Sequence, residues 1–258
     1  MTKPIQIRNL ILGNGFPKIC VPLTGTTAEG LFGEAEAARE AGADLVEWRA
    51  DFYDHLSETA LMLETLAKIN DILGEIPLLF TIRTKAEGGN REISTEDYVS
   101  LCIAAAASGK ADLIDVEVFG EEEKKKALIC EIQKKGAKVI GSSHDFEKTD
   151  DKETLLRRFQ AIDAAGADIL KMAVMPDEFE DVAAIMQVTS QMTAEYTEKP
   201  VISMSMGSLG SISRIAGENF GSAVTFATVG AASAPGQFPI KELRMMMEAL
   251  HAKNDSSL

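Results

Sequence analysis

The sequence predicts an α/β fold, a single (β/α)8 TIM barrel with a short N-terminal β-hairpin that closes its bottom. Short β-rich runs alternate with amphipathic segments of helical length, and the alternation occurs eight times. The length of 258 residues, 45% of them hydrophobic, suits one such barrel. Because no linker interrupts the pattern, we expect residues 1–258 to form a single domain.

Eight runs rich in apolar and β-branched residues mark the strands, and residues 5–14 before them have the pattern of the hairpin. The predicted strands cover residues 18–25, 44–51, 77–84, 112–119, 138–145, 168–175, 200–207 and 222–229. An open, doubly wound sheet is the alternative, but no GxGxxG follows the first strand and no P-loop occurs.

A helical segment follows each predicted strand. These segments cover residues 27–41, 57–73, 94–108, 122–135, 152–165, 178–196, 210–218 and 239–251. The seventh is short and rich in glycine and serine, so its helix is expected to be weak. We expect N-caps at Ser57 and Thr95. The expected left-handed residues after helices are Gly42, Gly109, Gly136 and Gly166.

Composition limits the partners and the compartment. A net charge of −14 argues against nucleic acid and anionic membranes, but a few arginines can still bind a small anionic substrate. The odd number and wide spacing of Cys20, Cys102 and Cys130 predict reduced thiols in a cytoplasmic protein. The N-terminus has no signal-peptide pattern, and no apolar stretch approaches the length of a membrane span.

Lys171 stands inside the otherwise apolar run DILKMAVM. A fully buried lysine is rare unless it is paired or takes part in chemistry. Burial beneath Met172 and Val174, with Arg49 and Arg83 nearby, would disfavour the ammonium form and favour a neutral, nucleophilic amine. The alternative is a strand-end lysine that extends its head into water.

Ionisable side chains also collect at the carboxyl ends of the other strands, where barrel enzymes have their active sites. Alternation places Glu47, Arg49 and Asp51 on one face of the second strand. The other candidates near these ends are Arg83, Glu87, Asp115, Glu117, Ser142, Ser143, His144, Asp145, Ser203, Met204, Ser205, Met206 and Arg214. Loop 230–239 has the small-residue composition of a lid. Together these groups indicate a ligand site.

These residue types predict Schiff-base lyase chemistry on a small keto acid. A neutral Lys171 amine that attacks a carbonyl forms an iminium, which acts as an electron sink. His144 is on the neighbouring strand and can move a proton α to that iminium, with Glu87 or Asp145 orienting its ring. Arg214 and Arg83 would hold a carboxylate or hydroxyl oxygens, since the arginine guanidinium suits carboxylate geometry.

Metal and thiol chemistry are disfavoured. His55, His144 and His251 are too scattered for a ligand cluster, and neither HxxxH nor HxH occurs, so no metal and no cofactor are expected. No cysteine stands at a strand's carboxyl end beside a histidine, which argues against a cysteine nucleophile.

Six motifs resemble the type I 3-dehydroquinate dehydratase family in their order and spacing. They are EWRAD (47–51), TIRTKAEGG (81–89), SSHDF (142–146), KMAVMP (171–176), SMGSLGSISR (205–214) and SAPGQ (233–237). The resemblance implies a homodimeric barrel of the shikimate pathway of aromatic amino acid biosynthesis. Such an enzyme converts 3-dehydroquinate to 3-dehydroshikimate.

The resemblance also implies residue roles. Lys171 would form the Schiff base with the C3 ketone. His144, partnered by Glu87, would remove the C2 proton and then help expel the C1 hydroxyl as water. The implied substrate contacts are Glu47, Arg49 and Arg83 at ring hydroxyls, Arg214 at the carboxylate, Ser233 and Gln237 on the closing loop, and Met204 and Met206 along the pocket.

Two other functions remain as alternatives. A class I Schiff-base aldolase also uses a barrel lysine, but such enzymes usually bind phosphorylated substrates, and no clear phosphate nest follows the last two strands. A non-catalytic barrel that binds small anions would need Lys171 to reach water, and it leaves His144 and Glu87 unexplained.

Overall fold

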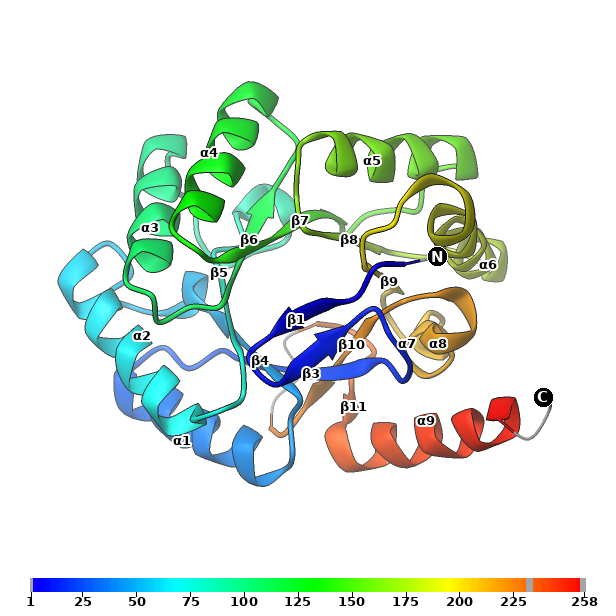
Figure 1. The fold of residues 1–258 in the computed structure, drawn as a ribbon, viewed down its shortest axis with the longest axis horizontal. Helices are drawn as coiled ribbons and strands as arrows, with labels where there is room; N and C mark the ends of the chain where they lie inside the picture. The colour runs from blue at the N-terminus through cyan, green and yellow to red at the C-terminus, as the bar shows by residue number, and fades with distance from the viewer. Residues whose placement is uncertain (1, 231–233, 256–258) are drawn as a thin grey trace.

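Eight parallel strands surround a common axis in the computed structural model, which describes residues 2–230 and 234–255 (Figure 1). They are β3 (Lys18–Leu23), β4 (Leu45–Arg49), β5 (Leu78–Thr81), β6 (Leu113–Glu117), β7 (Lys138–Asp145), β8 (Ile169–Val174), β9 (Val201–Ser205) and β10 (Val224–Thr228). Each lies within its predicted range, and the order β10-β3-β4-β5-β6-β7-β8-β9 follows the chain around the barrel. The predicted fold class is confirmed.

The seam between β9 and β10 completes the circle with few bonds. The Ala223 N–H donates to the Val201 carbonyl at 2.7 Å, and the Ser203 N–H donates to Ser222 Oγ at 3.1 Å. Val201 and Ser222 form an isolated parallel bridge. A further short strand, β11 (Phe238–Pro239), pairs with the end of β10 and was not predicted, because two residues carry no alternation signal.

Helices cover the outside of the barrel (Figure 1). They are α1 (Ala28–Glu40), α2 (Thr59–Leu73), α3 (Thr95–Ala107), α4 (Glu122–Lys134), α5 (Lys152–Ala164), α6 (Phe179–Gln191) with the π-helical turn η3 (Met192–Tyr196), α7 (Ser211–Ile215), α8 (Gly217–Phe220) and α9 (Ile240–Asp255). The weak seventh segment forms the two short helices α7 and α8. Across the described part of the chain, no helix is long and apolar enough to span a bilayer.

The predicted C-terminal glycines are confirmed, and the predicted N-caps are wrong. Gly42, Gly109, Gly136 and Gly166 all have positive φ, from 66° to 95°. The cap of α3 is Ser94, whose side chain accepts from the Asp97 N–H at 3.1 Å, and Thr95 is the first helical residue. At α2 the cap position is Glu58, and Ser57 precedes it. Such errors of one residue are expected where several polar residues adjoin a helix start.

The recurring AGAD and SGKAD segments end in aspartates that fix the starts of neighbouring strands. Each aspartate carboxylate accepts the backbone N–H of a residue on the strand beside it. The pairs are Asp44 with Ile19 at 2.8 Å, Asp112 with Leu78 at 2.9 Å and Asp168 with Val139 at 3.0 Å. The motif therefore repeats because the same junction recurs around the barrel.

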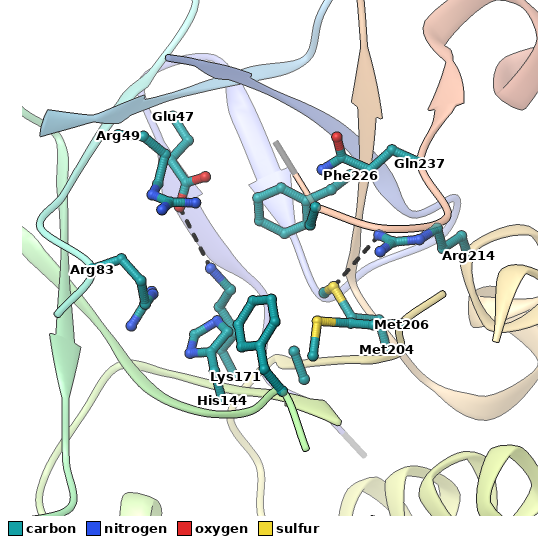
Figure 2. Close-up of a pocket in the computed structure, with 13 residues that line it drawn as sticks. Glu47, Arg49, Arg83, His144, Lys171, Met204, Met206, Arg214, Phe226 and Gln237 are labelled. Atoms are coloured by element: carbon teal, nitrogen blue, oxygen red, sulfur yellow. Dashed lines mark hydrogen bonds and ion pairs between the residues drawn. The ribbon is translucent and has the colours of Figure 1, made fainter. Parts of the chain in front are cut away.

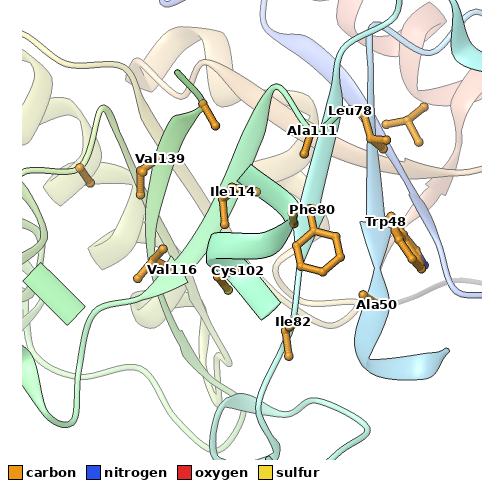
Figure 3. Packing of buried hydrophobic residues seen from close by; sticks show 14 of the residues in the cluster. Trp48, Ala50, Leu78, Phe80, Ile82, Cys102, Ala111, Ile114, Val116 and Val139 are labelled. Carbon is orange, nitrogen blue, oxygen red and sulfur yellow. The ribbon is translucent and has the colours of Figure 1, made fainter. Parts of the chain in front are cut away.

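Alternation along the strands separates two apolar layers. One lies between strands and helices, where the Trp48 and Phe80 rings meet edge to face with centroids 5.4 Å apart (Figure 3). The other fills the barrel interior with side chains such as Leu45, Leu79 and Ile169. The interior layer is apolar toward the starts of the strands. The polar groups at the carboxyl ends therefore lie directly above apolar side chains.

The hairpin of β1 (Ile5–Ile7) and β2 (Leu10–Leu12) covers the bottom of this interior layer. Ile7 and Leu12 are buried and belong to the same apolar cluster as the inward-facing residues of the strands. Arg8 in the hairpin turn donates from Nε to Asp112 Oδ1 at 2.7 Å, which fastens the hairpin to the barrel.

Candidate active site

Lys171 lies near the centre of the barrel mouth and is 4% exposed. Its Nζ is 3.5 Å from Glu47 Oε1 and 4.7 Å from the centroid of the Phe226 ring (Figure 2), and it is 3.4 Å from Asp115 Oδ2. The lysine is therefore buried and paired, and its head does not reach bulk water. Its ion-pair partners come from β4 and β6.

The prediction that Met172 and Val174 cover Lys171 was wrong. Met172 and Val174 belong to the layer between strands and helices, because adjacent residues of a strand point to opposite faces. The groups within ion-pair distance of Nζ are carboxylates, whereas Arg49 and Arg83 are paired with other partners.

Arg83 is the most heavily paired cation of the site. Its Nη2 lies 2.9 Å from Asp115 Oδ1, and its Nη1 lies 2.9 Å from Glu117 Oε1 and 3.4 Å from Glu87 Oε2. Burial alone would lower the pKa of Arg83, but the carboxylates of Asp115 and Glu117 raise it well above its usual value. Burial would likewise raise the pKa of Asp115, but Arg83 and then Lys171 hold it below its usual value. Both side chains therefore stay charged although they are buried away from solvent.

Arg49 is held by a fully buried carboxylate from its own strand end. Asp51, in the short helix η1 (Ala50–Phe52), accepts Nε and Nη2 of Arg49 at 2.8 Å each. The same carboxylate accepts the backbone N–H groups of Arg83 and Asn90 at 3.2 and 3.0 Å. Burial would raise the pKa of Asp51, but these bonds, led by that from Arg49, lower it. Asp51 thus fixes one arginine and two neighbouring segments.

His144 and Glu87 form a part-buried pair at the end of β7. Glu87 is in the short helix η2 (Lys85–Glu87), and its Oε2 lies 2.9 Å from His144 Nδ1 and accepts the His144 backbone N–H at 3.0 Å. Burial, then Arg83 and Lys171, lower the pKa of His144 well below its usual value. Burial and the Glu117 carboxylate raise the pKa of Glu87 to about 8. Asp145, the other predicted partner, instead accepts backbone N–H groups of the following turn.

Arg214 differs from the other cations because no carboxylate of the described chain lies within ion-pair distance of it. It is 1% exposed, donates from Nη2 to the Pro235 carbonyl at 3.0 Å, and lies 3.6 Å from the Met204 sulfur through Nη1. Its Nε is buried and has no hydrogen-bond partner among the described residues. Burial lowers the pKa of Arg214 to about 10, which reflects an uncompensated charge. A ligand carboxylate would supply the missing partner.

These groups surround one cavity at the carboxyl ends of the strands (Figure 2). Its lining comprises Glu47, Arg49, Arg83, His144, Phe146, Lys171, Ala173, Met204, Met206, Arg214, Phe226, Ala234 and Gln237. Of the expected site residues, Glu87 lies behind His144 and outside this lining, and Ser233 lies outside the described residues. The cavity combines apolar walls with convergent charges, as small-molecule sites do.

Several residues of the site had no role in the sequence prediction. Asp51, Asp115 and Glu117 were noted at strand ends, but contacts across the barrel decide their function. Phe146 and Phe226 form cavity walls and were not singled out, because an aromatic residue near a strand end usually belongs to the core. Among the described residues, no group of three histidine, cysteine, aspartate or glutamate side chains is placed to hold a metal ion.

The chain matches one protein family along most of its length. The family model described as type I 3-dehydroquinase matches residues 19–254. A 3-dehydroquinate dehydratase from Klebsiella pneumoniae is 44% identical over 250 residues, which cover 97% of this chain and 100% of the relative. Another from Bacillus licheniformis is 44% identical over 251 residues, which cover 97% of this chain and 99% of the relative.

Solved structures give the same result. A type I 3-dehydroquinate dehydratase from Clostridium difficile with covalently modified comenic acid superposes with a TM-score of 0.95 at 40% identity, covering 98% of this chain and 100% of that chain. A 3-dehydroquinate dehydratase from Geobacillus kaustophilus superposes with a TM-score of 0.94 at 39% identity, covering 97% of each chain.

The Asp51–Arg49 pair gives a stability prediction. Asp51→Asn leaves the Arg49 charge buried without its counter-ion, so the free energy of unfolding at pH 7 is expected to fall by about 3–5 kcal/mol in urea titrations. Asp54→Asn, at an exposed position nearby, should change it by less than about 0.5 kcal/mol.

Because folding lowers the pKa of Asp51, its stabilising effect is present above the ordinary carboxyl pKa of 3.8 and is lost as the pH falls through the lower folded value. The difference between wild type and Asp51→Asn should therefore shrink in acid. Equal stability of the two proteins at pH 7 would contradict the assigned role.

Proposed function

The chain belongs to the type I 3-dehydroquinase family, and on that basis we propose how its residues divide the work of the reaction. The enzyme is a lyase of the shikimate pathway of aromatic amino acid biosynthesis and eliminates water from 3-dehydroquinate to give 3-dehydroshikimate. The observation that carries the proposal is Lys171, buried at the barrel mouth between two carboxylates and next to the His144–Glu87 pair.

Lys171 is the proposed nucleophile toward the C3 ketone. Glu47 Oε1 lies 3.5 Å from Nζ and is the proposed acceptor of the ammonium proton, whereas Asp115, 3.4 Å from Nζ, stays ionised. The neutral amine then adds to the ketone carbon, and loss of water gives the iminium. Glu47 returns its proton to the hydroxyl that leaves as water, and the Glu47 and Asp115 carboxylates then stabilise the positive charge of the iminium.

His144 is the proposed proton carrier. Because Nδ1 is bonded to Glu87, Nε2 is the nitrogen available to the substrate. Nε2 takes the C2 proton, the iminium accepts the electron pair, and an enamine forms. The proton then passes to the C1 hydroxyl, which leaves as water while the enamine electrons regenerate an iminium. Hydrolysis of that iminium consumes one water, releases the product ketone and restores Lys171.

The remaining roles concern binding and orientation. Arg214 is assigned to the substrate carboxylate, because it is buried and its charge has no carboxylate partner in the described chain. The other proposed contacts are Glu47, Arg49 and Arg83 with ring hydroxyls, Ser233 and Gln237 with the substrate from the closing loop, and Met204 and Met206 along the pocket wall.

We also propose that residues 1–258 form one domain and that the enzyme is a cytoplasmic homodimer with no nucleic-acid partner. The continuous barrel from β3 to β10 supports the single domain. The cysteines of the chain are all free, which fits a reducing compartment. The net charge of −14 opposes binding to nucleic acid. The homodimer rests on the family resemblance.

Borohydride trapping tests the nucleophile. Incubation with 3-dehydroquinate followed by reduction should leave a mass adduct on the peptide that contains Lys171, because reduction converts the iminium to a stable amine. Lys171→Ala should give no adduct and no measurable turnover.

Full turnover by Lys171→Ala without an adduct would contradict the mechanism. An adduct with phosphorylated keto sugars but not with 3-dehydroquinate would favour an aldolase, and no adduct with either would favour an anion-binding barrel.

His144→Ala separates proton transfer from imine formation. The variant should lose about 10²–10⁴-fold in kcat, because general acid–base catalysis contributes on that order, while borohydride still traps the Lys171 adduct. His55→Ala is the matched control, because His55 is half-exposed and pairs only with Glu58 at the surface. Turnover of His144→Ala near the wild-type rate would exclude it as the proton carrier.

Fractionation of source cells tests compartment and assembly together. The dehydratase activity is expected in the cytoplasmic fraction, in a species with twice the chain mass of 27.8 kDa by light scattering. Activity in a membrane or exported fraction would contradict the location, and a species of single chain mass would contradict the homodimer.

A further inference from the structure

Glu117, at the end of β6, holds the segment that carries Glu87 without lining the substrate cavity. It is 3% exposed. Its Oε1 accepts Nη1 of Arg83 at 2.9 Å and the Thr84 N–H at 2.8 Å, and its Oε2 accepts the Thr84 hydroxyl at 2.7 Å. The Glu117 N–H donates to the Tyr98 hydroxyl at 3.1 Å. The carboxylate is therefore fixed in place and fully bonded.

Thr84 connects Glu117 to Glu87. It is the residue immediately before η2, and its carbonyl accepts the Glu87 N–H at 3.0 Å and the Gly89 N–H at 2.8 Å. A Cβ on Gly89 would lie 1.9 Å from the Arg83 carbonyl oxygen, so this turn packs too closely for any side chain there. Glu117 thereby determines where the Glu87 carboxylate lies relative to His144.

Glu117 also acts on Glu87 through its charge. After burial, the Glu117 carboxylate is the largest influence that raises the pKa of Glu87, and Arg83 opposes it. Since Glu87 and His144 are hydrogen-bonded, the proton that titrates belongs to the pair rather than to either residue.

A second cavity lies behind the pair. Glu87 and Glu117 line it together with His144 and Phe146, and only the last two also line the substrate cavity. All the polar contacts that fix the Glu87 carboxylate are made by Oε2. The second cavity therefore gives the pair a route to solvent on the side away from the substrate.

We propose that Glu117 is a positioning residue that sets the proton affinity of the Glu87–His144 pair, which exchanges its proton with solvent through the second cavity. The proposal rests on the proposed function of that pair. With two protons, the pair presents an N–H at Nε2 and is an acid. With one proton, the pair presents a lone pair at Nε2 and can take the C2 proton. Glu117 thus controls how much of the base form exists at a given pH.

Other charges face the pair from every side. Those on the surrounding elements are Glu47, Arg49, Arg83, Lys85, Asp115, Glu121, Lys125, Asp145, Glu147, Arg158 and Lys171, with the phenol of Tyr98. Glu117 differs from these because it bonds both to Arg83 and to the residue that begins the turn of Glu87.

Glu117→Gln removes the charge while keeping a side chain of the same shape that can still accept from Arg83 and Thr84. Without the nearby negative charge, ionised Glu87 is favoured, so the base form persists to lower pH. The midpoint of the acidic limb of kcat is expected to fall by about one pH unit. A ¹⁵N NMR titration of His144 in the free enzyme should shift by the same amount, and the chain has only 3 histidines to assign.

Two variants separate charge from packing. Glu121→Gln removes a carboxylate from the rim of the same cavity, where Glu121 pairs with Lys124, and should leave both midpoints unchanged. Glu117→Asp keeps the charge and should stay closer to wild type than Glu117→Gln does.

Wild-type midpoints in Glu117→Gln, or equal shifts in Glu117→Gln and Glu117→Asp, would overturn the proposal, because lost packing alone would then account for any fall in kcat. The NMR titration needs no turnover. It therefore tests the role of Glu117 even if 3-dehydroquinate proved not to be the substrate.

Discussion

The barrel mouth depends on the pairing of buried charges around Arg83. This guanidinium contacts carboxylates from β6 and from the segment after β5, and it donates to Ser142 on β7 at 3.1 Å. A buried charge that loses its partner is strongly destabilising, so the three elements must keep their relative positions for these charges to remain paired. The apolar layers stabilise the fold, and this network specifies how its catalytic end is arranged.

Arg83 and Arg214 are buried at opposite sides of the barrel mouth, and their bonding partners determine what each can bind. Arg83 is saturated by carboxylates, so it can offer a substrate hydroxyl only weak additional bonding. Arg214 has a carbonyl and a sulfur as neighbours, so most of its bonding capacity remains for an anion. The positive charge free to select a carboxylate is thus concentrated at one point, which favours one orientation of a small substrate.

The sequence predicted the architecture well because parallel buried strands appear as apolar runs, and because left-handed glycines mark the helix ends. It also predicted that Lys171, His144, Glu87 and Arg214 lie together at the barrel mouth, since the carboxyl ends of the strands meet there in any such barrel. It could not predict that Asp115 contacts Lys171, because β6 and β8 are not neighbouring strands and alternation says nothing about contacts across the barrel. The error at Met172 and Val174 came from treating strand neighbours as packing partners.

The pairing between neighbouring strands is uneven around the barrel. Between β7 and β8 the register is unbroken from Ile140↔Ile169 to Asp145↔Val174, and this is where His144 and Lys171 stand. Between β9 and β10 there is one isolated bridge, and the chain segments that carry Arg214 and the Pro235 loop follow those two strands. In the proposed mechanism, the substrate carboxylate is therefore bound beside the sparsely bonded seam, and the proton is moved beside the fully paired strands. A catalyst built in this way can adjust its grip on the substrate without disturbing the alignment of its chemistry.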